Sequence, residues 1–337
     1  MAYRVCISGY YGFGNFGDEL ILEILIKNLK SFNKKMEITV FAADAAAERY
    51  ENIVKTFNFI DVIRAVKRSD CLISGGGGLL QDSSSAASFL YYLFVIGSAL
   101  AFKKKVIIFA QGIGPVKNKF LKKLMLMMLK HADYITVRDK NSLKLLIENG
   151  IKKAQLCCDP VWNAAIPECI KQNRIGVQLR SCKIISDNFI TRLAENINKY
   201  YSDKEIYILS LQNSFDLDVC EKFKSRLKTL NSSIKAEVIK NTSNEKVLQD
   251  ISSCLKLISM RYHACLIGIK AGVKVLPVSY DIKVKALAEE FDLDFINDEN
   301  EMDALFERFE KFGGSEYNKE KIPQLKYDFA GLEEVMI

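Results

Sequence analysis

The stretch Ser259-Met-Arg-Tyr-His-Ala-Cys-Leu-Ile-Gly-Ile-Lys-Ala-Gly272 decides the fold class of this chain. The apolar run Leu255–Ser259 predicts a buried parallel strand, and the pattern over Ala264–Ala271 predicts a helix that Gly272 ends. The apolar residues Val273–Val278 predict the next strand. Strand, helix and strand in this order indicate a parallel sheet in an α/β protein.

Polar side chains follow both of these predicted strands. Arg261 and His263 come directly after the first strand, and Tyr280 and Lys283 come after the second. Because open α/β sheets bind ligands at the C-terminal edge of their strands, we expect these side chains to line a binding site. A cationic pocket with one titratable imidazole suits a small anionic substrate whose reaction needs proton transfer. The alternative for His263 is an imidazole held in the core.

Length and composition set the limits of the interpretation. A chain of 337 residues with 49% hydrophobic residues predicts two domains with cores of ordinary size. The net charge of +7 is spread along the chain, which suits anionic substrates or an anionic membrane surface and argues against nucleic acid. The nine cysteines form no CxxC pair and the N-terminus has no signal peptide, so we expect reduced thiols in the cytoplasm. No His or Cys spacing predicts a metal site.

Strands, glycine-rich turns and helices alternate along the chain, with one interruption at Pro160–Asn173. We therefore predict an N-terminal Rossmann-like domain over 1–165 and a C-terminal one over 173–315. A final helix over 316–337 is expected to pack back on the first domain. The segment 45–56 has a helical composition. The predicted fold class is α/β, with two Rossmann-like domains facing across a cleft as in glycosyltransferases of the B type.

The string Gly12-x-Gly14-x-x-Gly17 follows a predicted strand and opens a helix, as in the dinucleotide fingerprint. Two features argue against NAD. Asp18 and Glu19 occupy the first helical turn, where a pyrophosphate would meet like charge, and the next strand ends about 27 residues after Gly17. Gly12 and Gly17 instead allow a ligand to approach the backbone, while Asn15 and Asp18 offer contacts to sugar hydroxyls. The alternative for Asp18 is to satisfy the free amides of the helix start.

A second glycine-rich segment, Gly75-Gly-Gly-Gly78-Leu-Leu-Gln81-Asp82, predicts a crossing from strand to helix. Four consecutive glycines cost conformational entropy, so a compensating reason is expected. One reason is close approach of a ligand to Gly76, Gly77 and Gln81, and the other is a tight buried turn. Asp82 is a candidate general base for a sugar hydroxyl, or a cap of the following helix.

Two arginines end predicted strands elsewhere. Arg138 is suited to bind a carboxylate or phosphate; alternatively Asp139 caps a helix and Arg138 pairs with it or with Asp159, which we interpret as structural. Arg180 ends the first strand of the second domain and is a candidate for binding an anionic donor. The alternative for Arg180 is a solvated surface side chain.

Taken together, these motifs resemble the polysaccharide pyruvyl transferase family. The resemblance rests on Gly9–Glu19, on Gly75–Asp82 and on the Arg-Tyr-His element at 261–263 followed by Lys283. It implies transfer of the enolpyruvyl unit of phosphoenolpyruvate to a sugar as a cyclic ketal, with release of phosphate. In the best-known branch of this family the acceptor is an N-acetylmannosamine in a lipid-diphosphate-linked precursor of a secondary cell wall polymer, and the acceptor is the property that varies most across the family. The resemblance implies phosphoenolpyruvate as co-substrate and no cofactor.

The expected roles follow from the charges. Arg180, Arg261 and Lys283 would bind the donor, which carries about three negative charges at neutral pH. His263 would act as acid and base, and Asp18 or Asp82 would orient or deprotonate the acceptor hydroxyls. The alternative function is a nucleotide-sugar glycosyltransferase of the same fold.

A lipid-linked acceptor implies transient docking of a cytoplasmic enzyme at the inner face of the membrane. The candidate surface consists of lysines beside the apolar run Leu124–Leu129, namely Lys117, Lys119, Lys122, Lys123 and Lys130. The sequence does not predict an oligomeric state.

Overall fold

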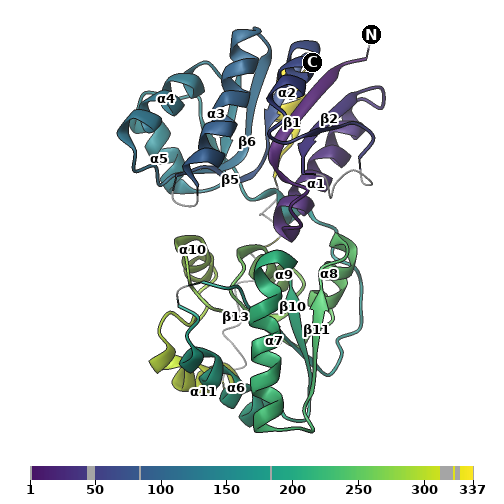
Figure 1. Cartoon of the computed structure of the whole chain (residues 1–337), viewed down its shortest axis with the longest axis vertical. Coiled ribbons are helices and arrows are strands. Elements are labelled where there is room, and N and C mark those ends of the chain that lie inside the picture. The colour runs from purple at the N-terminus through teal and green to yellow at the C-terminus, as the bar shows by residue number, and fades with distance from the viewer. Residues whose placement is uncertain are drawn as a thin grey trace. The chain divides into compact units, whose positions relative to one another are not determined.

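A computed structural model describes residues 2–43, 50–82, 85–182, 184–311, 322 and 327–336. The chain divides into two compact units (Figure 1). Unit 1 comprises residues 1–164 and 326–337, and unit 2 comprises residues 165–325. Residues 166–172, which lie between the two predicted domains, belong to unit 2. None of the described helices is both long and apolar enough to cross a membrane.

Unit 1 is built on a parallel sheet with the strand order β3-β2-β1-β4-β6-β7-β8, and β5 pairs with β6. The strands are β1 Arg4–Tyr11, β2 Glu37–Ala42, β3 Ile53–Lys55, β4 Cys71–Ser74, β5 Gly77–Leu80, β6 Lys105–Ile113, β7 Tyr134–Val137 and β8 Gln155–Leu156. In β6 every residue after Lys105 is buried, as expected for a central strand covered on both faces.

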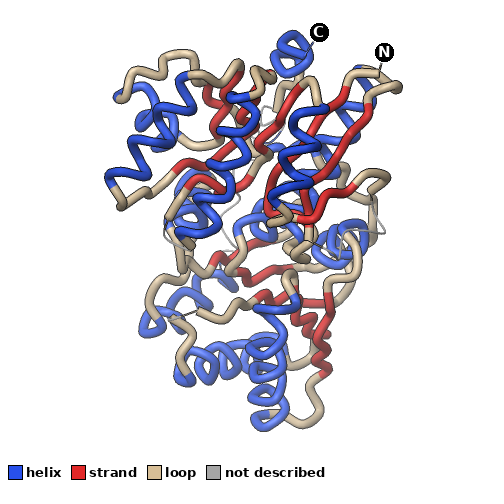
Figure 2. Tube along the Cα trace, turned by 45° about the horizontal axis from the view of Figure 1, so that its top comes forward, coloured by secondary structure: helices blue, strands red, loops and turns tan. Residues whose placement is uncertain are grey.

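The helices of unit 1 cover both faces of this sheet (Figure 2). They are α1 Phe16–Phe32, α2 Phe59–Arg68, α3 Ala86–Ala101, α4 Lys119–Lys130, α5 Lys140–Glu148, the 3-10 turn η2 Pro160–Asn163 and α12 Ala330–Met336. Helix α1 connects neighbouring strands in one direction across the sheet, whereas α2 to α5 run in the other direction. Because such crossovers are right-handed, α1 lies on one face and α2 to α5 lie on the other.

Two layers of core follow from this arrangement. Val106 and Ile108 of β6 pack with α3 and α4 in one cluster. Phe109, which points to the other face, packs against Tyr327 at 4.8 Å and Phe329 at 5.8 Å between ring centroids. The segment before α12 therefore completes the second face of the sheet.

Local sequence fixes where the helices of the α2–α5 face begin. Asn58, Ser85, Asn118 and Asp139 are the N-caps of α2, α3, α4 and α5, and each side chain accepts a backbone N–H from the first turn. Such caps satisfy amides that have no partner within the helix. All four helices start where a strand ends, so their N-termini lie at the C-terminal edge of the sheet.

Unit 2 contains a second parallel sheet, with the strand order β11-β10-β9-β12-β13. The strands are β9 Arg174–Gln178, β10 Glu205–Ser210, β11 Lys235–Lys240, β12 Lys256–Ser259 and β13 Lys274–Pro277. The helices are α6 Asp187–Tyr201, α7 Asn213–Leu230, α8 Asn244–Ser252, α9 Tyr262–Lys270, α10 Ile282–Glu290, the 3-10 turn η3 Glu299–Glu301 and α11 Met302–Lys311. Helices α6, α7 and α11 share one core cluster, and α8 packs on α9.

The structure corrects three local predictions. Within the segment predicted as helical over 45–56, Ile53–Lys55 form the edge strand β3, and residues 45–49 lie outside the described residues. The second glycine run leads into the strand β5 rather than directly into a helix. The predicted final helix over 316–337 is described as helical only over Ala330–Met336, which belongs to unit 1, and residues 316–321 and 323–326 lie outside the described residues.

Candidate active site

Arg180 and Tyr280 meet at the C-terminal edge of the unit 2 sheet. Arg180 Nη1 donates a hydrogen bond to Tyr280 Oη at 3.1 Å, and both side chains are partly buried. The guanidinium carbon lies 5.5 Å from the centre of the Tyr280 ring and 5.9 Å from that of Phe215. Among the described residues no carboxylate forms an ion pair with Arg180. The structure thus brings the predicted site residues Arg180 and Tyr280 into contact, and no described carboxylate balances the charge of the Arg180 guanidinium.

The electrostatics of this pair favour anion binding. Burial alone would lower the pKa of the Arg180 guanidinium, but the neighbouring Tyr280 and Asp216 outweigh it and the pKa is raised. Burial raises the pKa of the Tyr280 phenol above its ordinary value. At neutral pH the pair therefore consists of a guanidinium and a neutral phenol whose own O–H hydrogen is available to a ligand.

Arg261 is held differently from what its predicted role requires. Its Nε and Nη2 atoms donate to both carboxylate oxygens of Asp216, at 3.0 and 2.6 Å, and Nη2 also donates to Gln212 at 3.2 Å. Both charged side chains are buried. Asp216 also accepts the backbone N–H groups of Leu211 and Gln212. The charge of Arg261 is therefore balanced, and its contacts tie the start of α9 to the start of α7.

His263 is the second residue of α9 and is partly buried. Its ring lies edge-on to Tyr262, with 5.1 Å between the centroids. Arg261 is the N-cap of α9, and no side chain caps that helix. His263 therefore lies in the first turn of a helix that starts at the C-terminal edge of the sheet, where the predicted ligand edge is.

Lys283 occupies the first turn of α10 at the same edge of the sheet, and its side chain is exposed. The carboxylate of Asp281 accepts the backbone N–H groups of Lys283 and Val284, at 3.0 and 2.9 Å. Asp281 thus caps α10.

The first glycine-rich loop of unit 1 is shaped by its own backbone. Gly12 has φ +78°, and a Cβ there would lie 2.6 Å from the carbonyl oxygen of Ala43. Its N–H donates to the Glu19 carboxylate at 2.7 Å. Gly17 is buried within the first turn of α1. These contacts explain the glycine spacing without a dinucleotide.

Asp18 lies in this loop at the start of α1, almost wholly buried. Asn15 Nδ2 donates to its carboxylate at 2.5 Å. Asn15 is the N-cap residue of α1, but its side chain does not cap the helix. Asn15 and Asp18, both predicted to contact a sugar, instead bind each other. Burial, followed by the charge of Asp18, raises the pKa of Tyr92 and of Tyr11. A buried carboxylate whose charge is felt by two neutral tyrosines is suited to receive hydroxyl groups.

The second glycine run packs tightly against α1. A Cβ at Gly76 would lie 2.9 Å from Ile21, and one at Gly77, which has φ +106°, would lie 2.8 Å from Asp18 Oδ1. A Cβ at Gly75 would overlap the hydroxyl of Tyr11. The tight-turn interpretation therefore accounts for these glycines, and it brings the start of β5 next to Asp18.

Gln81 and Asp82 follow β5 and are partly buried. The Asp82 carboxylate accepts the backbone N–H groups of Lys117, at 2.9 Å, and Asn118, at 2.8 Å. These two hydrogen bonds lower the pKa of the Asp82 carboxyl below its usual range, and the bond from Asn118 has the larger effect. Asp82 therefore organises the loop before α4, while Ser85 caps α3.

Arg138 forms an ion pair with Asp159, which was the alternative to its predicted role in binding an anion. Arg138 Nη1 and Asp159 Oδ2 are 2.5 Å apart, and both side chains are buried. Asp139 caps α5, and Asp159 caps η2. Arg138 has its charge balanced in unit 1, and we do not include it in the proposed donor site.

Sequence reasoning did not identify the aromatic residues near Asp18. Tyr10 and Phe13 stack at 4.3 Å with an interplanar angle of 7°, and both rings are partly exposed. The only sequence signal was their placement on either side of Tyr11-Gly12 in a loop already considered for sugar contacts.

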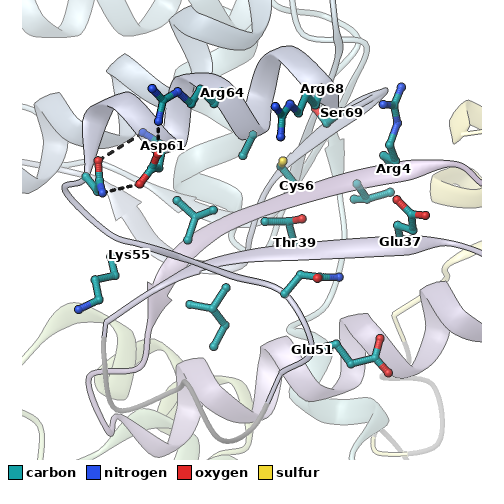
Figure 3. Close-up of a pocket in the computed structure, with 16 residues that line it drawn as sticks. Arg4, Cys6, Glu37, Thr39, Glu51, Lys55, Asp61, Arg64, Arg68 and Ser69 are labelled. Atoms are coloured by element: carbon teal, nitrogen blue, oxygen red, sulfur yellow. Dashed lines mark hydrogen bonds and ion pairs between the residues drawn. The ribbon is translucent and has the colours of Figure 1, made fainter.

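A groove of about 1010 Å³ in unit 1 contains none of the predicted site residues (Figure 3). It runs between α2 and strands β1 to β3. Two of its arginines form ion pairs, Arg64 with Asp61 at 2.9 Å and Arg4 with Asp70 at 3.1 Å. Within the described part of the chain, no three His, Cys, Asp or Glu side chains are placed to hold a metal ion.

Comparison with solved structures defines the fold. The chain is similar to a putative UDP-N-acetylglucosamine 2-epimerase from Listeria monocytogenes, with TM-score 0.65 and 10% identity, covering 97% of this chain and 92% of that one. It is also similar to Anabaena HepE, solved with UDP and glucose, with TM-score 0.64 and 8% identity, covering 98% of this chain and 97% of that one. These likenesses confirm the predicted class of two Rossmann-like domains of the glycosyltransferase B type. No curated protein sequence matches the chain.

The family follows from a sequence profile. The profile of polysaccharide pyruvyl transferases matches residues 15–282, which include Arg180, His263 and Tyr280. The chain belongs to the polysaccharide pyruvyl transferase family. It is a transferase whose family acts in the transfer of pyruvate to polysaccharide.

Proposed function

We propose that this protein transfers the enolpyruvyl unit of phosphoenolpyruvate to two hydroxyls of one sugar in a lipid-diphosphate-linked cell-wall polysaccharide precursor, such as N-acetylmannosamine. The observation that carries the proposal is the Arg180–Tyr280 pair in a member of this family, a partly buried cation with which no carboxylate of the described residues forms an ion pair. The product is a cyclic ketal of pyruvate, and phosphate is released.

The donor site would use the charges of unit 2. The fork of the Arg180 guanidinium binds the donor carboxylate through two parallel hydrogen bonds, and Tyr280 donates its O–H beside it. The exposed ammonium of Lys283 attracts the phosphate as a point charge. Arg261 contributes by holding the first turn of α9 in place through Asp216.

The reaction needs a proton at carbon, and His263 is the side chain assigned to supply it. Protonation of the methylene carbon makes the adjacent carbon electrophilic, and one hydroxyl oxygen then adds to it. The carbon–phosphate oxygen bond breaks, and the second hydroxyl closes the ring. The two hydroxyl protons balance the scheme, since one replaces the proton added to carbon and the other leaves on phosphate. Such acid–base catalysis contributes about 10²–10⁴-fold to a rate.

The acceptor would be bound by unit 1. Asp18 is suited to orient and deprotonate hydroxyls because its carboxylate is buried beside Tyr11 and Tyr92. Asp82 is the less favoured base, because two backbone amides already occupy its oxygens. The partly exposed face of the Tyr10–Phe13 stack offers an apolar surface to a sugar ring.

The test is to incubate the protein with phosphoenolpyruvate and a panel of lipid-diphosphate disaccharides. We expect release of phosphate together with a product heavier than the acceptor by one pyruvic acid less one water. Binding of a nucleotide sugar in saturation-transfer NMR, with none of phosphoenolpyruvate, would refute the proposal and favour a glycosyltransferase.

A further inference from the structure

Five large apolar side chains are exposed at the starts of three neighbouring helices of unit 1. Phe57 and Phe59 are each 48% exposed, Ile60 63%, Leu90 47% and Phe120 72%. We call these five residues the apolar rim.

The apolar rim belongs to one face and one edge of the sheet. Helix α2 packs on α3 and α3 packs on α4, and all three lie on the same face. Phe57, Phe59, Ile60 and Phe120 lie before or within the first turns of α2 and α4, and Leu90 is the fifth residue of α3. The rim therefore lies toward the C-terminal edge of the sheet, as do Asp18 and Asp82. Monomeric proteins rarely gather large apolar side chains at one edge without a partner.

Part of the apolar rim is rigid and strained. Phe57 has φ +70°, a left-handed conformation that a bulky residue rarely adopts, and its ring nevertheless remains half in solvent. The Phe57 ring packs on Tyr91 at 4.8 Å, and the Phe59 ring packs edge-on to Phe94 at 5.1 Å. The protein thus holds these rings in place at the surface instead of burying them, which is what a docking surface requires.

Cations flank the rim at its α4 end. Lys117, Lys119 and Lys123 are exposed around Phe120, and Lys122 is partly exposed. The predicted membrane surface used the apolar run Leu124–Leu129. Met125, Leu126 and Leu129 of that run are in the core and therefore cannot contact a membrane.

We infer that the apolar rim and these lysines dock unit 1 on an anionic lipid surface, which holds the lipid of the acceptor. The inference rests on the proposed function, since a lipid-linked sugar brings the enzyme to a bilayer. A bilayer with anionic headgroups matches both features, because apolar rings enter its boundary while lysines stay at the headgroups. One loop links this surface to the acceptor edge, because Asp82 binds the amide of Asn118, the N-cap two residues before Phe120.

The test is flotation of the full chain with vesicles of phosphatidylglycerol and phosphatidylcholine at low salt. The wild type should float with these vesicles and not with vesicles of phosphatidylcholine alone. Ile60→Ser with Phe120→Ser should weaken vesicle binding about tenfold or more, since buried apolar groups and nearby lysines both contribute to it. Ile170→Ser is the matched control, because Ile170 is 88% exposed and lies in unit 2.

Three outcomes would overturn the inference. One is a wild type that stays unbound at low salt, and another is a rim variant that floats as the wild type does. The third is a rim substitution that breaks a dimer in sedimentation while no vesicle binds, which would assign the rim to a second copy of the chain. Failure of the proposed function appears separately, as flotation without pyruvate transfer. If both proposals hold, the rim variant still modifies a short-chain, water-soluble acceptor but loses transfer to the vesicle-bound one.

Discussion

Replacing Asp216 by Asn tests whether the buried Arg261 serves the fold or the donor. The substitution keeps the shape of the side chain and an oxygen for the amides of Leu211 and Gln212. Among the described residues, it removes the only carboxylate that forms an ion pair with the Arg261 guanidinium. Breaking a buried ion pair from one side costs about 3–5 kcal/mol, because the other charge stays buried without compensation. We expect the lower end, about 3 kcal/mol, since the amide can still accept one hydrogen bond.

The measurement is urea unfolding, with two probes because the chain has two units. Trp162 is the single tryptophan and belongs to unit 1, so its fluorescence reports on that unit, while circular dichroism reports on both. With a slope of about 2 kcal/mol per molar urea, Asp216→Asn should lower the midpoint of the unit 2 transition by on the order of 1–2 M. The fluorescence transition should not move.

Asp303→Asn is the matched control for this experiment. Asp303 pairs with Arg192 in the same unit, with 2.7 Å between Nη2 and Oδ2, but the Asp303 side chain is 63% exposed and that of Arg192 is 24% exposed. Exposed ion pairs contribute about 1 kcal/mol or less, so the control should unfold almost as the wild type does. The reasoning fails if both variants unfold alike and Asp216→Asn instead raises the KM for phosphoenolpyruvate strongly. Arg261 would then act on the donor, as its sequence context suggests.

Four further substitutions test the site and the glycine loop beside Asp18. Arg180→Ala should weaken phosphoenolpyruvate binding in calorimetry by about 10–150-fold, because hydrogen bonds to charged groups contribute about 1.5–3 kcal/mol. Tyr280→Phe should weaken the same binding by about tenfold or less. Unchanged affinity in Arg180→Ala would exclude Arg180 from the donor site. His263→Ala should show a wild-type thermal melt but about 10²–10⁴-fold slower pyruvate transfer, and wild-type turnover would exclude its role as acid and base. Gly77→Ala should destabilise unit 1 by about 1–3 kcal/mol in the Trp162 fluorescence transition, because its φ is +106° and the new Cβ would lie 2.8 Å from Asp18 Oδ1. A Gly77→Ala variant as stable as the wild type would show that the loop relaxes around the methyl group.

The parts of the fold that depend on local patterns could be predicted from the sequence. Glycines, caps and apolar runs are local signals, so the alternation of strands and helices and the break near Pro160 were readable. The strand Ile53–Lys55 was not predicted, because a three-residue edge strand is too short to show the alternation of apolar and polar residues. Arg180 and Tyr280 were found together because both follow strands of one parallel sheet, whose ends meet at one edge.

The state of a charge could not be predicted in the same way. Arg261 looked like a donor ligand because its neighbours in the sequence are polar, but Asp216, its partner, lies 45 residues earlier. The two come together only because the parallel sheet of unit 2 brings the starts of α7 and α9 to the same edge. The same holds for Arg138 and Asp159, whose pairing the sequence offered only as one of two possibilities. Burial and pairing of charges are therefore properties of the tertiary structure.

The return of the chain to unit 1 has a consequence for biosynthesis. Phe109 of the central strand is covered by Tyr327 and Phe329, and Lys105 Nζ donates to the carbonyl oxygen of Val335 at 2.7 Å. On the ribosome these partners emerge only after residues 165–325 have been made. Until then the part of the first sheet that these residues cover stays open on the nascent polypeptide, where chaperones would bind it. The later-made domain, whose core is contiguous in sequence, is thus free to fold before the earlier one is finished.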